Sequence, residues 1–143
     1  MKKIYVINGP NLNRLGKREP EVYGKHTIED LEKMLFPLGD DFGCTFIFKQ
    51  SNHEGNIIDW IHEAEDEQAI GVVLNPGAFT HYSYAIRDAV ASIRVPVIEV
   101  HISNVHSREA FRHTSVISPV TEGQIVGFGF YGYKMAALAF LER

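Results

Sequence analysis

The sequence predicts an α/β fold in which a parallel sheet of about five strands is covered by helices on both faces. Short runs rich in β-branched and aromatic residues alternate along the chain with segments whose apolar residues recur at helical spacing. The run at residues 70–74 is continuously apolar, which is typical of a strand buried on both faces. Because crossovers between parallel strands are right-handed, this alternation places helices on both faces of one sheet.

Length and composition narrow the possible classes of protein. The 143 residues, 45% of them hydrophobic, fit a single domain, which we expect to span residues 1–143. A net charge of -4 argues against a nucleic-acid partner, because duplex binding needs a broad basic surface. Cys44 is the only cysteine, so no intrachain disulfide is expected and a cytoplasmic location fits. The mostly apolar residues 125–141 carry Lys134 near their middle, so we expect no membrane segment.

The first two strand and helix units are expected in the first half of the chain. A strand at residues 3–7 is stopped by a Gly-Pro pair. Thr27 begins a capping-box pattern, which predicts a helix that ends at Gly39, before a polar turn. Residues 45–49 predict a second strand, and a second capping-box pattern at residues 51–54 predicts the next helix. The expected apolar face of that helix contains Ile57, Trp60, Ile61 and Ala64.

The second half continues the alternation. A helix at residues 83–93 would turn Asp88 away from its buried side, which is formed by Ile86, Val90 and Ile93. Residues 96–102 predict a fourth strand, and a short helical turn should follow around residues 107–112. We expect a brief fifth strand near residues 115–118, and we interpret residues 125–141 as a strand end, a turn and the last helix. The predicted topology is flavodoxin-like, with strand order 2-1-3-4-5.

The loop after the first strand is the first candidate for chemistry. It is crowded with Asn, Gly, Pro, Arg and Tyr, and it is longer than the usual connection of two to six residues. Loops of that length are typically lids, binding loops or disordered segments. Arg14, Lys17 and Arg18 make it basic within an acidic chain, so it would attract an anionic substrate.

Polar side chains gather where the first, third and fourth strands end. They are Asn11, Arg18 and Tyr23 after the first strand, Asn75 and His81 after the third, and Glu99, His101 and Ser103 on and after the fourth. The carboxyl ends of parallel strands share one edge of the sheet, so we expect these groups to converge on one pocket. Their neutral amide and hydroxyl groups suit a polyhydroxylated ligand, although Asn and Ser are also ordinary turn residues.

Two pairs of residues have acid–base potential. Glu99 and His101 lie on the same face of a strand, and a carboxylate beside an imidazole suits a general acid. A buried pair with a purely structural role is the alternative. Arg18 beside Tyr23 would favour the phenolate and so permit a tyrosinate base. Its alternative is a lid tyrosine that only packs, next to a solvated arginine.

Other site classes lack their signatures. His53, His62, His106 and His113 show no metal-ligand spacing, so no metal site and no cofactor are expected. The GxGxxG, GxxxxGK[ST] and GxSxG motifs do not occur, which leaves dinucleotide, P-loop and serine-hydrolase functions unsupported. A flavin- or phosphate-binding module and a catalytically silent scaffold remain the rival interpretations.

Several blocks together resemble the type II 3-dehydroquinate dehydratases of the shikimate pathway. They are NGPNLNRLG at residues 8–16, REPEVYG at 18–24, LNPGAFTH at 74–81, IRDA at 86–89, EVHISN at 99–104, REAFRHTSVIS at 108–118 and GFGFYGY at 127–133. These blocks occur in order over essentially the whole chain. The resemblance implies elimination of water from 3-dehydroquinate through an enolate, without a cofactor.

The resemblance also implies a role for each site residue. Tyr23 would be the base, held as tyrosinate by Arg18, and His101, oriented by Glu99, would protonate the departing hydroxyl. Asn11 would position a water that stabilises the enolate. The substrate would be held by Asn75, His81, Ile102, Ser103 and Arg112. Asp88 would reach the site of a neighbouring subunit in a dodecamer built from trimers, and the loop with Arg18 and Tyr23 would act as a lid.

Overall fold

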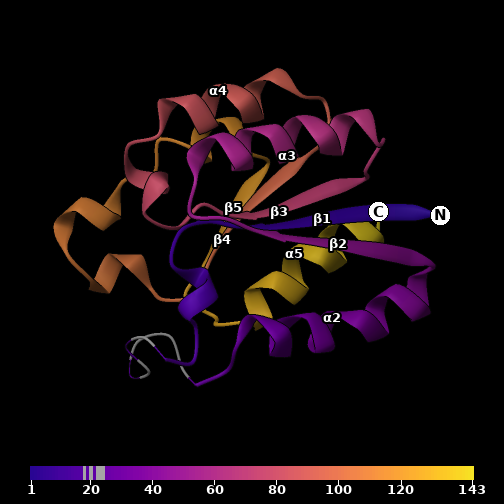
Figure 1. Cartoon of the computed structure of the whole chain (residues 1–143), viewed down its shortest axis with the longest axis horizontal. Helices are drawn as coiled ribbons and strands as arrows, with labels where there is room; N and C mark the ends of the chain where they lie inside the picture. The colour runs from indigo at the N-terminus through magenta and orange to yellow at the C-terminus, as the bar shows by residue number, and fades with distance from the viewer. Residues whose placement is uncertain (18, 20, 22–24) are drawn as a thin grey trace.

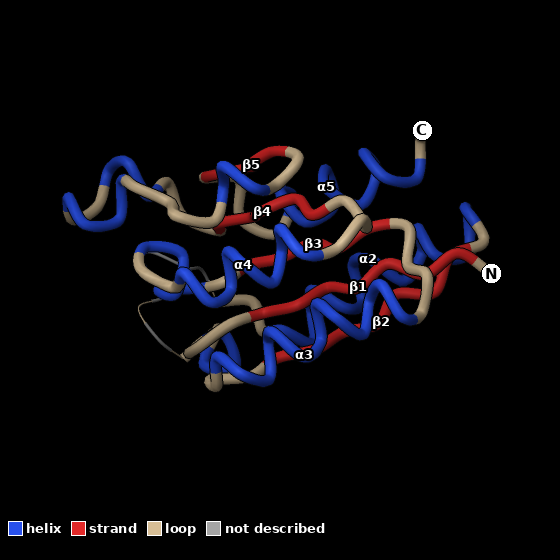
Figure 2. Tube along the Cα trace, turned by 90° about the horizontal axis from the view of Figure 1, so that it is seen from above, coloured by secondary structure: helices blue, strands red, loops and turns tan. Residues whose placement is uncertain are grey.

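The computed structural model describes residues 1–17, 19, 21 and 25–143. Over these residues, five parallel strands form one sheet in the order β2-β1-β3-β4-β5 (Figure 1). The strands are β1 (Lys2–Asn8), β2 (Cys44–Gln50), β3 (Gly71–Asn75), β4 (Val97–His101) and β5 (Gly123–Val126). They run side by side in one direction, so their carboxyl ends meet at a single edge (Figure 2). The predicted fold class and strand order are confirmed.

Four α-helices of the described part of the chain cover the two faces of the sheet. They are α2 (Ile28–Phe42), α3 (Glu54–Asp66), α4 (Tyr84–Ser92) and α5 (Tyr131–Leu141). The helices α2 and α5 lie on one face, and α3 and α4 lie on the other (Figure 1). Short 3-10 helices lie in the connecting segments: η1 (Leu12–Arg14), η2 (Gly77–His81), η3 (Val105–Ser107), η4 (Ala110–His113) and η5 (Ser118–Val120). The first four come after the carboxyl ends of β1, β3 and β4, whereas η5 precedes the amino end of β5.

The central strand β1 shows why the sheet needs two layers of helices. Ile4 and Val6 pack into the core beneath α2 and α5, whereas Tyr5 and Ile7 pack into the core beneath α3 and α4. All four side chains are at most 1% exposed. A strand that is buried on both faces must be apolar throughout, so its sequence shows a continuous run rather than alternation.

Helix α2 begins at its predicted position but ends later than predicted. Thr27 and Asp30 form a reciprocal capping box, and Gly43 ends the helix with a φ of 65°. The expected end at Gly39 and the polar turn at residues 40–43 are therefore wrong. A Cβ on Gly39 would lie 2.6 Å from the carbonyl oxygen of Cys44. This glycine permits close packing of α2 on β2 and does not stop the helix.

The second predicted capping box is also wrong, although the helix that should follow it is present. His53 is the N-cap residue of α3, and no side chain caps the helix there. Ser51 instead accepts hydrogen bonds from the backbone N–H of His53 at 2.9 Å and from the side chain of Asn56 at 2.8 Å. Glu54 accepts a hydrogen bond from Ser83, the N-cap residue of α4. Because Ser51 and Glu54 make these hydrogen bonds instead, they do not form the predicted capping box.

The fifth strand lies downstream of its predicted position. Residues 115–118 are not a strand, and β5 pairs with β4 only from Gly123 onward. The hydroxyl oxygen of Ser115 accepts the backbone N–H groups of Ile117 at 3.1 Å and Ser118 at 2.9 Å, which bends the chain into a turn. Ile117 is fully buried under α4, so its apolar character reflects core packing.

Candidate active site

A cavity of about 200 Å³ opens at the carboxyl edge of the sheet. Seven of the predicted site residues line it, namely Asn11, Asn75, His81, His101, Ile102, Ser103 and Arg112. They come from the ends of β1, β3 and β4 and from the short helices that follow, so the predicted convergence is present. A larger cavity of about 630 Å³ adjoins it and shares Ile102, Ser103 and Arg108, but it lacks His101. We therefore assign the chemistry to the smaller cavity.

Glu99 and His101 form the buried pair at the base of this cavity. The Nε2 atom of His101 lies 2.6 Å from Oε2 of Glu99, and the two residues are 6% and 0% exposed. Glu99 also accepts hydrogen bonds from Ser115 at 2.9 Å and from Gln124 at 2.6 Å. A carboxyl group with three donors around it acts as an acceptor, so Nε2 of His101 carries a proton. The other ring nitrogen, Nδ1, is then the one available to a ligand.

His81 uses the other ring nitrogen, Nδ1, for its hydrogen bond to the protein. Its Nδ1 lies 2.8 Å from the carbonyl oxygen of Thr114, and because a carbonyl can only accept, Nδ1 is the donor. Burial lowers the pKa of His81 below its usual value, and this effect outweighs the hydrogen bond to Thr114, which raises it. The neutral ring therefore offers Nε2 as an acceptor for a ligand hydroxyl. Phe111 packs edge-on against it, with ring centroids 5.9 Å apart.

Asn75 is held by a buried network. Its Oδ1 accepts the backbone N–H of Gly77 at 3.1 Å, and its Nδ2 donates to the hydroxyl of Tyr133 at 2.9 Å. That hydroxyl donates in turn to Asn8 at 2.6 Å. Asn8 and Asn75 are register partners on β1 and β3, so both amides reach the same tyrosine of α5. The network sets which end of the Asn75 amide faces the cavity.

The loop after β1 enters the site through Asn11. This residue has a φ of 70°, a left-handed conformation that Asn tolerates better than most residues. Its backbone N–H donates to the side chain of Asn52 at 3.0 Å, and Gln50 donates to the carbonyl of Gly9 at 3.2 Å. Side chains at the end of β2 and just after it thus hold the start of the loop in place.

Two arginines supply the positive charge of the cavity. Arg112 was predicted, and its Nε donates to Glu109 at 2.9 Å while its guanidinium lies 4.7 Å from the centre of the Phe111 ring. Arg108 also lines the cavity and donates to the hydroxyl of Ser103 at 3.3 Å. The prediction omitted Arg108, although its spacing of four residues from Arg112 in a polar segment is a usable signal. Both guanidinium groups suit a carboxylate ligand.

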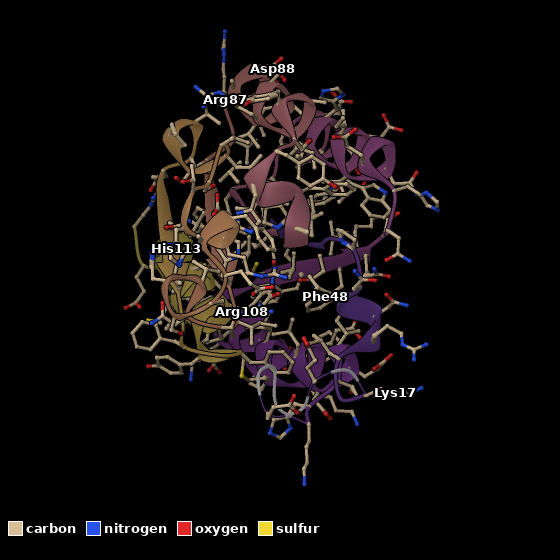
Figure 3. All side chains as sticks on the ribbon, turned by 90° about the vertical axis from the view of Figure 1, so that its left-hand side faces the viewer. Lys17, Phe48, Arg87, Asp88, Arg108 and His113 are labelled. Carbon is tan, nitrogen blue, oxygen red and sulfur yellow. The ribbon has the colours of Figure 1, made fainter. Side chains whose placement is uncertain are left out.

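One predicted residue, Asp88, lies apart from this cavity. Asp88 is exposed on α4, as the helical spacing predicted, and it does not line the cavity. In Figure 3, which faces the carboxyl edge, it lies at the far end of the molecule from Lys17, with Arg108 between them. Arg18 and Tyr23 lie outside the described residues.

The described residues contain neither a metal-binding cluster nor a membrane-spanning helix. Among residues 1–17, 19, 21 and 25–143, no cluster of His, Cys, Asp and Glu side chains has the geometry of a metal site. No helix in the same part of the chain has both the length and the hydropathy needed to span a bilayer.

Comparison with known proteins identifies the family. The family described as Dehydroquinase class II matches residues 2–141. The 3-dehydroquinate dehydratase of Halalkalibacterium halodurans is 67% identical over 142 residues, which cover 99% of this chain and 97% of the relative. That of Bacillus licheniformis is 62% identical, with the same coverage of the two chains.

Solved structures agree with this match. The type II dehydroquinase from Butyrivibrio crossotus superposes with a TM-score of 0.94 at 54% identity, covering 99% of this chain and 98% of the other. The type II dehydroquinase from Propionibacterium acnes gives 0.95 at 44% identity, covering 100% and 98%. This chain belongs to the class II dehydroquinase family.

Proposed function

We propose that the protein is a 3-dehydroquinate dehydratase that removes water by anti elimination through an enolate, using a tyrosinate base and a histidine acid. The activity is the one that the matched relatives carry in their names. The observation that carries the mechanism is the hydrogen bond between Glu99 and His101, because His101 lines one cavity with Asn75 and His81. The reaction is that of a hydro-lyase of the shikimate pathway and yields 3-dehydroshikimate.

The first step removes a proton from the carbon next to the substrate ketone. We assign it to Tyr23, with Arg18 favouring the phenolate, on the basis of the REPEVYG block at residues 18–24. The negative charge moves to the ketone oxygen as the enolate forms. Asn11 lines the cavity and would hold the water that donates to this oxygen.

The second step breaks the bond between carbon and the departing hydroxyl. The enolate collapses to a conjugated ketone, and the hydroxyl leaves as water after it has received a proton. His101 supplies this proton from Nδ1, because its Nε2 is occupied by Glu99. A base and an acid on opposite faces of the ring give anti elimination.

The remaining groups bind the substrate. His81 accepts from a hydroxyl through Nε2, and Asn75 supplies its fixed amide. Arg112 holds the carboxylate together with polar groups of Ile102 and Ser103. We add Arg108 to this set, because it lines the same cavity and contacts Ser103.

The assembly and setting of the enzyme are part of the proposal. We propose a single domain at residues 1–143, a homo-oligomer, namely a dodecamer built from trimers, and a cytoplasmic location. Asp88 would serve the site of a neighbouring subunit, and its exposure on α4 supports this role.

The test is a direct assay. With 3-dehydroquinate added, the ultraviolet absorbance of the conjugated product should rise, and the Tyr23→Phe variant should lose most turnover while it keeps its fold and substrate binding. Tyr84→Phe, at an exposed tyrosine that does not line the cavity, is the matched control. Near wild-type turnover of Tyr23→Phe would remove Tyr23 as the base, and no product from the unaltered protein would refute the activity.

A further inference from the structure

Gln124 contacts the Glu99–His101 pair from the neighbouring strand. In the parallel register of β4 and β5, Glu99 is the partner of Gln124, and these strands lie side by side in Figure 1. The side-chain amide of Gln124 donates to Oε2 of Glu99 at 2.6 Å. This is the oxygen that also lies 2.6 Å from Nε2 of His101. Oε2 of Glu99 is therefore the partner of two side chains, the amide of Gln124 and the imidazole of His101.

The second oxygen of Glu99 is held separately. Ser115 donates to Oε1 at 2.9 Å, and its own oxygen is fixed by two backbone N–H groups. Glu99 is 0% exposed, so protein donors rather than bulk water surround its carboxylate in this structure. An ionised carboxylate in such a place must be satisfied by protein donors.

We propose that Gln124 is a positioning residue, which holds Oε2 of Glu99 where it orients the imidazole of His101 for proton transfer. A carboxylate fixed only at Oε1 can rotate about its last carbon–carbon bond, and Oε2 then moves together with the imidazole. The donors on both oxygens prevent that rotation. The inference rests on the proposed function, because it needs His101 to be the acid and Glu99 to orient it.

The position of Gln124 determines which kinetic constant should change. It does not line the cavity, so it acts on the reaction only through Glu99. Its removal should lower kcat and leave KM nearly unchanged, since substrate contacts are intact. Gln124 is an exposed residue of the edge strand β5, so replacing its side chain leaves the buried core intact.

The experiment compares two unbranched replacements that differ in their terminal donor. Gln124→Met has similar length and no N–H group, whereas Gln124→Lys places an ammonium donor near Glu99. We expect kcat of Gln124→Met to fall roughly tenfold with KM within about twofold, because a hydrogen bond to a charged, buried acceptor is lost. Gln124→Lys should recover most of this loss. Thr45→Val, at an exposed residue on the opposite edge strand, is the control and should keep wild-type kcat.

The outcomes separate this inference from the proposed function. Wild-type kcat in Gln124→Met, or equal losses in Gln124→Met and Gln124→Lys, overturns the inference. A rise in the KM of Gln124→Met with unchanged kcat also overturns the inference. The kcat of Glu99→Gln is measured in parallel. A strong loss of kcat in this variant supports the role of Glu99, whatever the result for the Gln124 variants. If Glu99→Gln is fully active, the role of Glu99 and that of Gln124 both fail.

Discussion

The buried hydroxyl of Tyr133 on α5 accepts the side-chain amide of Asn75, at the end of β3, across 2.9 Å. Burial raises the pKa of Tyr133, so the phenol stays protonated and can donate to Asn8. Tyr133→Phe should destabilise the fold by about 1–3 kcal/mol, because two buried amides each lose a partner. It should also raise KM, because the Asn75 amide is less firmly oriented.

Denaturant unfolding and steady-state kinetics measure the two effects. Tyr131→Phe makes the same change at a tyrosine that is 56% exposed, and it should alter neither quantity. An unchanged KM in Tyr133→Phe, together with the expected loss of stability, would show that the network supports the fold alone.

His81 should make stability depend on pH. Burial lowers its pKa in the folded state, whereas the unfolded chain takes up a proton near the ordinary value of 6.5. The unfolded state then binds more protons as the pH drops, so this contribution to stability is present above about pH 6.5 and is lost as the pH falls through the folded pKa. His81→Asn should therefore lose less unfolding free energy than the unaltered protein between about pH 7 and pH 5.

Unfolding transitions measured across that range test the sign of the effect. His62→Asn makes the same substitution at an exposed position on α3 and serves as the control. An equal loss of stability in His81→Asn and in the unaltered protein would contradict the expectation.

The reaction should proceed without a Schiff base. No lysine lines the cavity formed by the described residues, and each step has a non-covalent candidate. Borohydride added with substrate should leave the mass and the activity of the protein unchanged. Mass spectrometry is the readout, and a stable adduct of substrate and lysine would exclude the proposed enolate route.

Two inactive variants should restore activity together if Asp88 serves a neighbouring site. Equal amounts of His101→Asn and Asp88→Ala chains, unfolded and refolded as a mixture, should recover roughly a quarter of the sites. In a cyclic interface, a complete site needs His101 from one chain and Asp88 from the next, and each is intact with a chance of about one half.

Each variant refolded alone provides the baseline for this mixing experiment. Asp88→Ala must itself be strongly impaired, and light scattering must show that both variants reassemble. A mixture no more active than its components would mean that Asp88 serves its own chain or only the interface.

Local patterns predicted the central elements well and the periphery less well. The apolar runs of β1 and β3 are unambiguous because both faces of these strands are buried. The edge strand β5 begins with Gly123 and Gln124, neither of which favours strands, so only its end at Ile125 and Val126 has a strand-like sequence. Residues 115–118 look more like a strand, yet the hydrogen bonds of Ser115 make them a turn.

The residues of the candidate site also differ in how well the sequence predicts their positions. Groups at strand ends, such as Asn75 and His101, could be placed from topology, because parallel strands share one carboxyl edge. The supporting residues Tyr133 and Gln124 could not, since they reach the site from elements whose position follows only from the assembled sheet. Sequence spacing carries no information about such contacts.

The hydrogen bond between Asn8 and Tyr133 joins residues 125 positions apart, so the site depends on both the first strand and the last helix. During synthesis on the ribosome, the first strand emerges long before α5, so the amides of Asn8 and Asn75 lack their hydrogen bonds to Tyr133 until α5 is made. A nascent chain that stalls before α5 therefore has most of the residues of the site but cannot arrange them. Activity becomes a property of the finished polypeptide, and a prematurely terminated chain should bind substrate poorly and be an easy target for proteases.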